Sequence, residues 1–162
     1  MWGGQSVQES FPPDAEYPMD PEFPDNTVLA DTLMNSQYLI VGSERLKDFL
    51  AKKQLSPVEY LKVRIRDHRG KSAASYWIIN PLDNVDCLDH MASGALVSRV
   101  DKTQVIKVKR TILREDALDP SRQLFRITGY PQGILIRRDL ADDIYAAGFS
   151  GIKFRELETK DK

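Results

Sequence analysis

Residues 58–80, VEYLKVRIRDHRGKSAASYWIIN, decide the fold class of this 162-residue chain. Val58–Arg66 alternates apolar with charged residues, which predicts a strand with one buried face. The charged segment Asp67–Lys71 predicts a turn and Ser75–Asn80 a second strand, so the two strands form a hairpin. We expect the apolar residues of the first strand to face the core and its charged residues to face water. The apolar set is Val58, Tyr60, Leu61, Val63 and Ile65, and the charged set is Glu59, Lys62, Arg64 and Arg66.

Two short helices are predicted, one on each side of this hairpin in the sequence. The first follows a short strand at Tyr38–Val41 and runs from the N-cap Ser43 to about Lys53. The second covers about Arg138–Ala147 and ends at Gly148, a residue type that favours helix ends. Both helices have an apolar face, made of Leu46, Phe49 and Leu50 in the first and of Leu140, Ile144 and Tyr145 in the second.

A gapless shift of 94 residues lays residues 39–63 over residues 133–157. Apolar positions then coincide through a unit of strand, helix, turn and strand, with Ile152–Leu157 as the final strand. A structural repeat and a chance agreement between similar elements both explain the pattern. Between the units, Leu96–Val100 and Gln104–Leu113 predict a second hairpin. The expected fold is α+β: a mainly antiparallel sheet with two short helices, from two similar strand–helix–strand units that flank a central hairpin section.

Residues 1–35 differ in composition from the rest of the chain. Five prolines between residues 12 and 24 exclude a helix or a central strand, while interleaved aromatic residues argue against a disordered tail. We expect an extended, partly docked arm, a single α+β domain over residues 36–157, and a frayed tail over residues 158–162. Residues 1–44 contain eight acidic and no basic residues. The arm therefore either lies on its own basic body or reaches for a basic partner.

Few residues are suited to catalysis or metal binding. Cys87 is the only cysteine and lies in an apolar stretch, which favours a buried structural thiol. Asp86, Cys87, Asp89 and His90 lie close in sequence but lack the spacing of a CxxC or HExxH metal motif. The nine glycines form no phosphate-binding loop. We therefore expect no enzymatic activity, no metal and no cofactor.

The sequence also bears on location. No apolar run approaches the roughly 18 residues that a membrane span needs. The first residues, MWGGQSVQES, have neither the basic nor the apolar region of a secretory signal. We expect a cytoplasmic protein with no membrane partner.

A basic cluster in the central hairpin section raises an alternative, a nucleic-acid-binding accessory domain. Lys107, Lys109 and Arg110 are the residues whose neutralisation would weaken such binding. Aromatic residues for base stacking are absent from residues 96–114, and the sequence pI of about 6.1 is low for this function. Nucleic acid is therefore the second hypothesis.

Four stretches occur in an order that resembles a bacterial family of immunity proteins from polymorphic-toxin systems, long known as a domain of unknown function. They are Leu39–Leu50, Tyr76–Asp89, Leu124–Arg126 and Gly148–Phe154, and the resemblance spans about residues 36–157. The chain departs from the family pattern at 137–139, where a serine would precede the second helix. That helix is therefore expected to be capped differently.

The resemblance implies a protein that binds and neutralises a cognate bacterial toxin, encoded by an adjacent gene, and it implies no catalytic residue. We expect the toxin's active site to be blocked through a surface of roughly 800 Å² per partner. Irregular segments diverge easily while a scaffold persists, which suits one-to-one specificity. The expected contacts are therefore in the arm (Asp14, Glu16, Tyr17, Asp20 and Glu22) and in the 83–90 loop (Asp83, Asp86, Asp89 and His90). The sequence leaves open whether the chain forms a homodimer.

Overall fold

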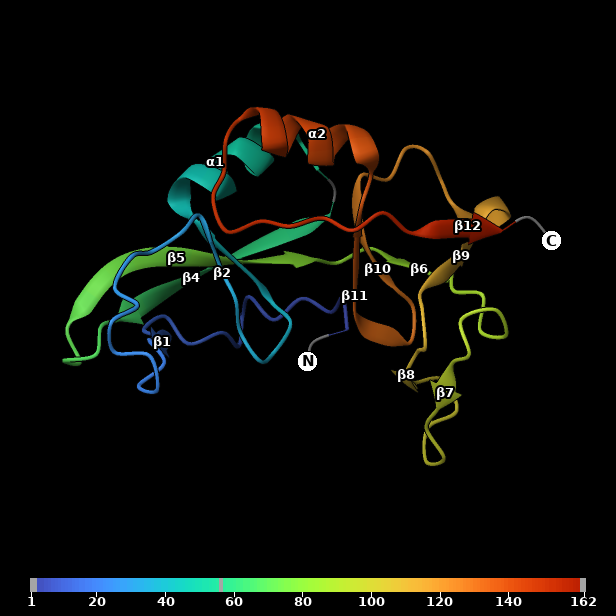
Figure 1. Ribbon diagram of the computed structural model, residues 1–162, viewed down its shortest axis with the longest axis horizontal. Helices are drawn as coiled ribbons and strands as arrows, with labels where there is room; N and C mark the ends of the chain where they lie inside the picture. Colours follow the sequence, from blue (N-terminus) through green and yellow to red (C-terminus); the bar gives the residue numbers. More distant parts are fainter. Residues whose placement is uncertain (1–2, 56, 161–162) are drawn as a thin grey trace.

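A computed structural model describes residues 3–55 and 57–160 of the chain (Figure 1). Its largest sheet has five strands in the order β1-β4-β5-β3-β2. β4 and β5 form the predicted hairpin, and β3 pairs antiparallel with β5. Both edges come from the N-terminal arm, because β1 pairs in parallel with β4 and β2 pairs antiparallel with β3. The bounds are β1 Glu16–Pro18, β2 Thr32–Leu33, β3 Ile40–Ser43, β4 Val58–Arg66 and β5 Ser72–Pro81.

The first half of β4 is covered on both faces of the sheet. Leu61 starts a buried row that continues with Val63 and Ile65, and Glu59 lies on the same face because side chains alternate along a strand. Tyr60 packs on the opposite face, in the cluster that the helices form. The expectation that Glu59 faces water is therefore wrong. Glu59 is only 5% exposed, because the N-terminal arm covers that face.

The two helices, α1 (Glu44–Lys52) and α2 (Arg138–Ala146), lie over the face of the sheet opposite the arm (Figure 1). Their apolar residues form one buried cluster with Ile79 of β5. Ser43 caps α1 as predicted, since its side chain accepts a hydrogen bond from the Leu46 N–H at 3.2 Å. Arg137 stands at the N-cap of α2 without a side-chain cap, and Gly148 follows that helix with a φ of +67°.

The other strands form three small sheets around a second core cluster. β10 lies between β11 and β6, and β7 pairs antiparallel with β8. The second hairpin is shorter than predicted, because the expected strand Gln104–Leu113 is divided into β8 and β9 and the latter pairs with β12. Cys87, Leu88 and Phe125 are among the buried residues of this cluster. The bounds are β6 Asn84–Val85, β7 Leu96–Val97, β8 Val105–Lys107, β9 Ile112–Arg114, β10 Leu124–Ile127, β11 Tyr130–Ile136 and β12 Glu158–Lys160, with a 3-10 helix at Glu115–Ala117.

The fold is α+β as expected, but its sheets are mixed rather than mainly antiparallel. Three strand pairs are parallel: β1 with β4, β6 with β10, and β9 with β12. Each joins segments that are distant in sequence. Residues 158–160, where we expected a frayed tail, form β12; residues 161–162 lie outside the described residues.

The expected repeat of two strand–helix–strand units is not shown. The first unit is present as β3, α1 and β4. In the second, β11 and α2 occur, but residues 152–157 form no strand. Ile152 and Phe154 instead pack as an extended segment against the helix cluster. Neither helix in the described part of the chain is long and apolar enough to cross a membrane.

Candidate functional site

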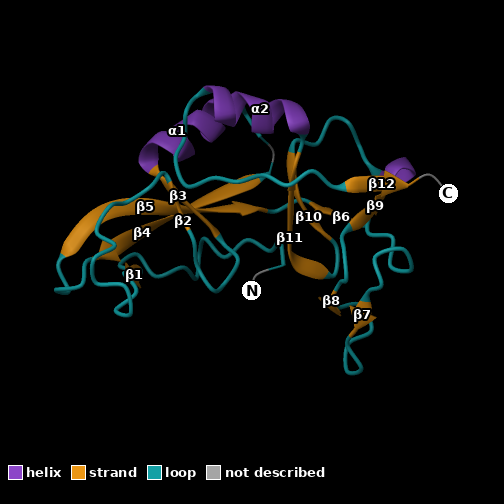
Figure 2. Cartoon of the chain, in the orientation of Figure 1, coloured by secondary structure: helices purple, strands orange, loops and turns teal. Residues whose placement is uncertain are grey.

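The acidic arm lies on its own body, in a segment that is mostly loop (Figure 2). Glu16 pairs with two arginines of β4: its Oε1 is 3.4 Å from Arg64 Nη2 and accepts a hydrogen bond from Arg66 Nη2 at 2.7 Å. The bond from Arg66 lowers the pKa of the Glu16 carboxyl. Tyr17 packs against the core cluster that includes Leu61, Val63 and Ile65, and its hydroxyl is 3.4 Å from Gln37 Oε1. Glu16 and Tyr17, two of the expected toxin contacts, are therefore bound to other parts of the same chain.

The other expected contacts of the arm are exposed to solvent. Asp14, Asp20 and Glu22 lie in turns before and after β1. The Asp20 carboxylate accepts a hydrogen bond from the Glu22 N–H at 2.9 Å, which fixes the local turn. A partner can therefore reach these three of the five expected arm contacts.

A buried polar network anchors the start of the arm. The Glu59 carboxylate accepts hydrogen bonds from Ser6 Oγ at 2.6 Å and from the Gln8 N–H at 2.9 Å. Asn80 Nδ2 also donates to Glu59, at 3.0 Å, while its Oδ1 accepts from Arg126 Nη2 at 3.0 Å. Burial alone would raise the pKa of Glu59, but these donors hold it below its ordinary value. The network joins the arm, the large sheet and β10.

Sequence reasoning missed the role of Arg126, which is 0% exposed. Its guanidinium also donates to the carbonyl oxygens of Pro81 at 3.1 Å and Pro131 at 2.8 Å. The available signal was a charged residue inside the apolar run Leu124–Ile127, because a charge within a buried strand needs partners.

Asp31 joins the end of the arm to both helices. Its carboxylate accepts hydrogen bonds from Ser43 Oγ at 2.8 Å and from the Ser150 N–H at 2.9 Å. It also pairs with Arg45 at 3.2 Å. Partial burial would raise the pKa of Asp31, but the Ser150 and Ser43 bonds and the Arg45 charge lower it. This residue is structural and belongs to no open site.

The 83–90 loop lies near the other end of the molecule from β1 (Figure 1). Its three acids have partners within the chain: Asp83 pairs with Arg122 at 2.7 Å, Asp86 pairs with Arg114 at 3.2 Å, and Asp89 accepts from the Ala92 N–H at 2.8 Å. Asp86 and His90 are nevertheless exposed. Because the loop and β1 lie near opposite ends of the molecule, the structure does not bring the two sets of expected contact residues together.

The basic residues of the nucleic-acid hypothesis lie at the end of the second hairpin and in the segment that follows it. Lys107 ends β8 and is exposed. The side chain of Lys109 lies against Gly94, where an added Cβ would be 2.9 Å from Lys109 Cδ. Arg110 is 3.8 Å from Glu158 of β12. Only the first of these belongs to the β7–β8 hairpin itself.

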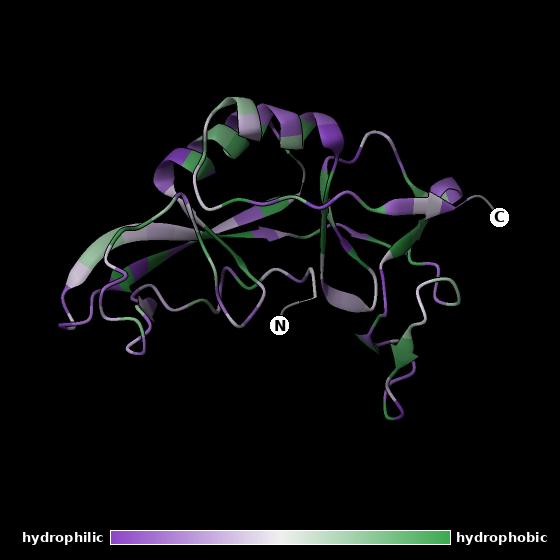
Figure 3. Ribbon diagram, in the orientation of Figure 1, coloured by the Kyte–Doolittle hydropathy of each residue, from purple (hydrophilic) through white to green (hydrophobic). Residues whose placement is uncertain are grey.

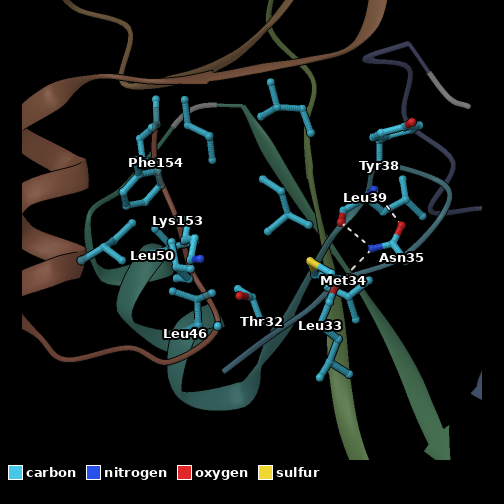
Figure 4. Close-up of a pocket in the computed structure, with 18 residues that line it drawn as sticks. Thr32, Leu33, Met34, Asn35, Tyr38, Leu39, Leu46, Leu50, Lys153 and Phe154 are labelled. Atoms are coloured by element: carbon cyan, nitrogen blue, oxygen red, sulfur yellow. Dashed lines mark hydrogen bonds between the residues drawn. The ribbon is translucent and has the colours of Figure 1, made fainter. Parts of the chain in front are cut away.

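An apolar cleft of about 670 Å³ opens beside the helices (Figure 4). Met34, Tyr38 and Leu39 border it on one side, and Phe154 and the helix residues on another. The Asn35 side chain is hydrogen-bonded to the backbone of Leu39. Its Oδ1 accepts from the Leu39 N–H at 3.0 Å, and its Nδ2 donates to the Leu39 carbonyl at 2.8 Å. None of the described lining residues is His, Cys, Asp or Glu. The cleft can receive an apolar group, and its lining also includes Tyr38 and Lys153.

Other candidates for chemistry are buried or lack partners of the right type. Cys87 is 0% exposed, and burial together with the nearby Asp86 raises the pKa of its thiol to about 11. Such a thiol is protonated at neutral pH and is a poor nucleophile. Among residues 3–55 and 57–160, no group of three or more His, Cys, Asp or Glu is placed to hold a metal ion.

Comparison with known proteins gives one family. No curated protein matches the chain significantly. A family model described as an immunity protein family, Imm11, matches residues 4–159, which includes nearly the whole arm as well as the body. The chain therefore belongs to the Imm11 family of immunity proteins, a non-enzymatic class.

Proposed function

We propose that this protein binds a cognate toxin, encoded by an adjacent gene, and neutralises it by covering the toxin's active site. The observation that supports this most is the family match over residues 4–159, since an immunity protein implies a toxin as partner. Covering an active site needs no chemistry from the inhibitor. It needs a rigid surface that fits the toxin and excludes its substrate.

We propose the exposed part of the 83–90 loop as a component of this surface. Asp86 and His90 are exposed there, and the backbone behind them is fixed, because the Asp89 N–H donates to the Ile112 carbonyl at 3.0 Å. The exposed arm residues Asp14, Asp20 and Glu22 are a second, separate candidate. Glu16 and Asp83 are less available, because both are paired with arginines of the same chain.

The test is co-purification of this protein with the product of the adjacent gene, followed by titration of toxin activity. We expect a stable complex, protection of cells that express the toxin, and inhibition that is competitive with the toxin's substrate. Inhibition that leaves substrate binding unchanged would contradict active-site covering while keeping neutralisation. No complex and no protection would refute the proposed function.

The two candidate surfaces are compared within the same assay. Asp86→Lys with His90→Asp alters the loop, and Asp14→Lys with Asp20→Lys alters the arm. We expect the loop pair to weaken binding and the arm pair to leave it within about twofold, since most rim residues contribute little. The reverse result would move the contact surface to the arm.

A further inference from the structure

We propose that the tip of the β7–β8 hairpin, residues 98–104, enters the toxin's cleft, with Val100 as the apolar anchor and with Arg99 and Lys102 against carboxylates at the rim. This inference rests on the proposed function and specifies the partner's chemistry: a protein surface with an apolar pocket bordered by acidic side chains.

Exposure of apolar residues is the first observation. The hairpin projects from the body (Figure 1), and Val100 at its tip is 98% exposed. Leu96 and Ile106, one on each strand, are also exposed large apolar residues. Figure 3 shows hydrophobic and hydrophilic residues interspersed along this segment. Three exposed apolar side chains on one projecting element favour an interaction surface, whereas scattered single ones need no explanation.

The tip is held in one conformation by its own hydrogen bonds. Ser98 Oγ accepts from the N–H groups of Val100 and Asp101 at 3.2 Å. The Asp101 carboxylate accepts from the Thr103 N–H at 2.9 Å and from its hydroxyl at 2.6 Å. The Ser98 N–H donates to the Gln104 carbonyl at 2.8 Å, which closes the turn. A loop fixed in this way loses little conformational entropy on binding.

The base of the hairpin is anchored in the core. Val105 is 5% exposed, and its N–H donates to the Gly129 carbonyl at 2.7 Å. Ser93 is fully buried, and its hydroxyl binds both the carbonyl and the N–H of Ile112, at 3.1 and 3.0 Å. The tip is therefore a fixed projection on a rigid base, the geometry that suits insertion into a concave surface.

Charge determines the kind of surface that fits the tip. The β7–β8 hairpin, residues 96–107, contains three basic residues, Arg99, Lys102 and Lys107, and one acidic residue, Asp101. The net charge of the hairpin is therefore positive, and the Asp101 carboxylate is turned toward Thr103. Arg99 and Lys102 are both exposed and flank Val100. A complementary partner surface is acidic, and opposite charges across an interface raise the association rate and select the partner.

A nucleic acid would also be attracted to these cations, but the apolar residues favour a protein. Val100 and Leu96 offer aliphatic surface and no aromatic ring for base stacking. A duplex backbone gives such residues nothing apolar to contact. A protein cleft does, and a buried aliphatic anchor there stabilises the complex.

The test measures the affinity of the purified full-length protein for its co-purified toxin by surface plasmon resonance. We expect Val100→Asp to weaken binding about 30-fold or more, as for a central anchor. Arg99→Glu with Lys102→Glu should lower the association rate constant about tenfold and reduce its dependence on salt. Both variants should unfold at the wild-type temperature, because they leave the hydrogen bonds of Ser98 and Asp101 in place.

Matched controls carry the same substitutions elsewhere. Val28→Asp alters another exposed aliphatic residue, 92% accessible, and Lys52→Glu with Arg155→Glu reverses two exposed cations outside the hairpin. These should bind within about twofold of wild type.

If the wild-type protein binds the toxin and Val100→Asp binds equally well, the inference fails and the proposed function stands. If the wild-type protein binds no toxin, both fail. Retardation of DNA or RNA that depends on Arg99 and Lys102, with toxin affinity unchanged, overturns the inference in favour of nucleic acid.

Discussion

Glu59 and Arg126 are both almost fully buried, yet neither is paired directly with an opposite charge among the described contacts. Asn80 lies between them: its Nδ2 donates to Glu59 and its Oδ1 accepts from Arg126, both at 3.0 Å. Buried charges are tolerated only when their hydrogen-bonding capacity is filled. The carboxylate meets this requirement largely with donors of the arm, such as Ser6 and Gln8.

The lowered pKa of Glu59 predicts a specific acid sensitivity. Because its folded pKa lies below the ordinary value of 4.5, its contribution to stability is fully present above that pH. The contribution is lost as the pH falls from about 4.5 through the lower, folded pKa. Glu59→Gln should cost about 1–3 kcal/mol at pH 7, by leaving buried donors poorly paired.

The measurement is urea unfolding of both proteins at several pH values from neutral to acidic. The free-energy difference between wild type and Glu59→Gln should shrink below about pH 4.5, since the wild-type carboxyl becomes neutral as well. Other carboxyls with lowered pKa, such as Asp31, affect both proteins alike. A difference that is constant with pH would contradict the assignment.

At the scale of elements, the two helices begin in different ways. Ser43 caps α1 through the Leu46 N–H and also donates to Asp31, whereas Arg137 gives α2 no side-chain cap. Ser43→Ala should therefore lower the free energy of unfolding by about 1–2 kcal/mol. Arg137→Ala removes only contacts near the surface and should cost less than about 1 kcal/mol.

Thermal unfolding compares the Ser43→Ala and Arg137→Ala variants. Ser43→Thr, which keeps the hydroxyl, is the control. Equal losses for Ser43→Ala and Arg137→Ala would contradict this difference.

Elements with a local signal were predictable, and those that depend on distant partners were not. Leu46 and Leu50, at helical spacing behind a capping serine, indicated α1, and the alternation of β4 indicated the main hairpin. Nothing near residues 158–160 indicates a strand, because β12 exists only through its pairing with β9. The prediction that Glu59 faces water failed for a related reason. When both faces of a strand are covered, polar residues no longer mark the solvent-exposed face, so the alternation of residue types does not show which side chains are buried.

The candidate contact residues show the same limit. Composition shows an acidic first segment and a more basic remainder, but it could not show that Glu16 pairs with Arg64 and Arg66. Nor does a list of apolar residues distinguish the exposed Val100 from the buried Val105, since both belong to one short hairpin segment. Exposure follows from which segment lies above each residue, and that is decided by tertiary packing.

At the scale of the whole molecule, the arm completes the fold and is not an appendage. It supplies both edge strands of the large sheet, and its apolar residues, among them Phe11 and Met19, pack on the face opposite the helices. The Met19 N–H donates to the Arg66 carbonyl at 2.9 Å, and the Arg64 N–H donates to the Ala15 carbonyl at 2.9 Å. The family match, which begins at residue 4, is in keeping with an arm that the body needs.

This dependence predicts a coupling between the arm and the sheet. A protein lacking residues 1–12 loses the donors Ser6, Val7 and Gln8, so the Glu59 carboxylate meets water instead of the arm. In that protein Glu59→Gln should be nearly neutral, while in the full chain it costs about 1–3 kcal/mol, so the double-mutant cycle should give a coupling free energy of that size. As a control, Ser43→Ala should cost the same in both backgrounds, since the hydrogen bonds of the Ser43 side chain go to Asp31 and Leu46, both outside the deleted segment. Urea unfolding of the four proteins measures the cycle. Equal costs of Glu59→Gln with and without the arm would mean that the arm's hydrogen bonds to Glu59 do not stabilise the fold.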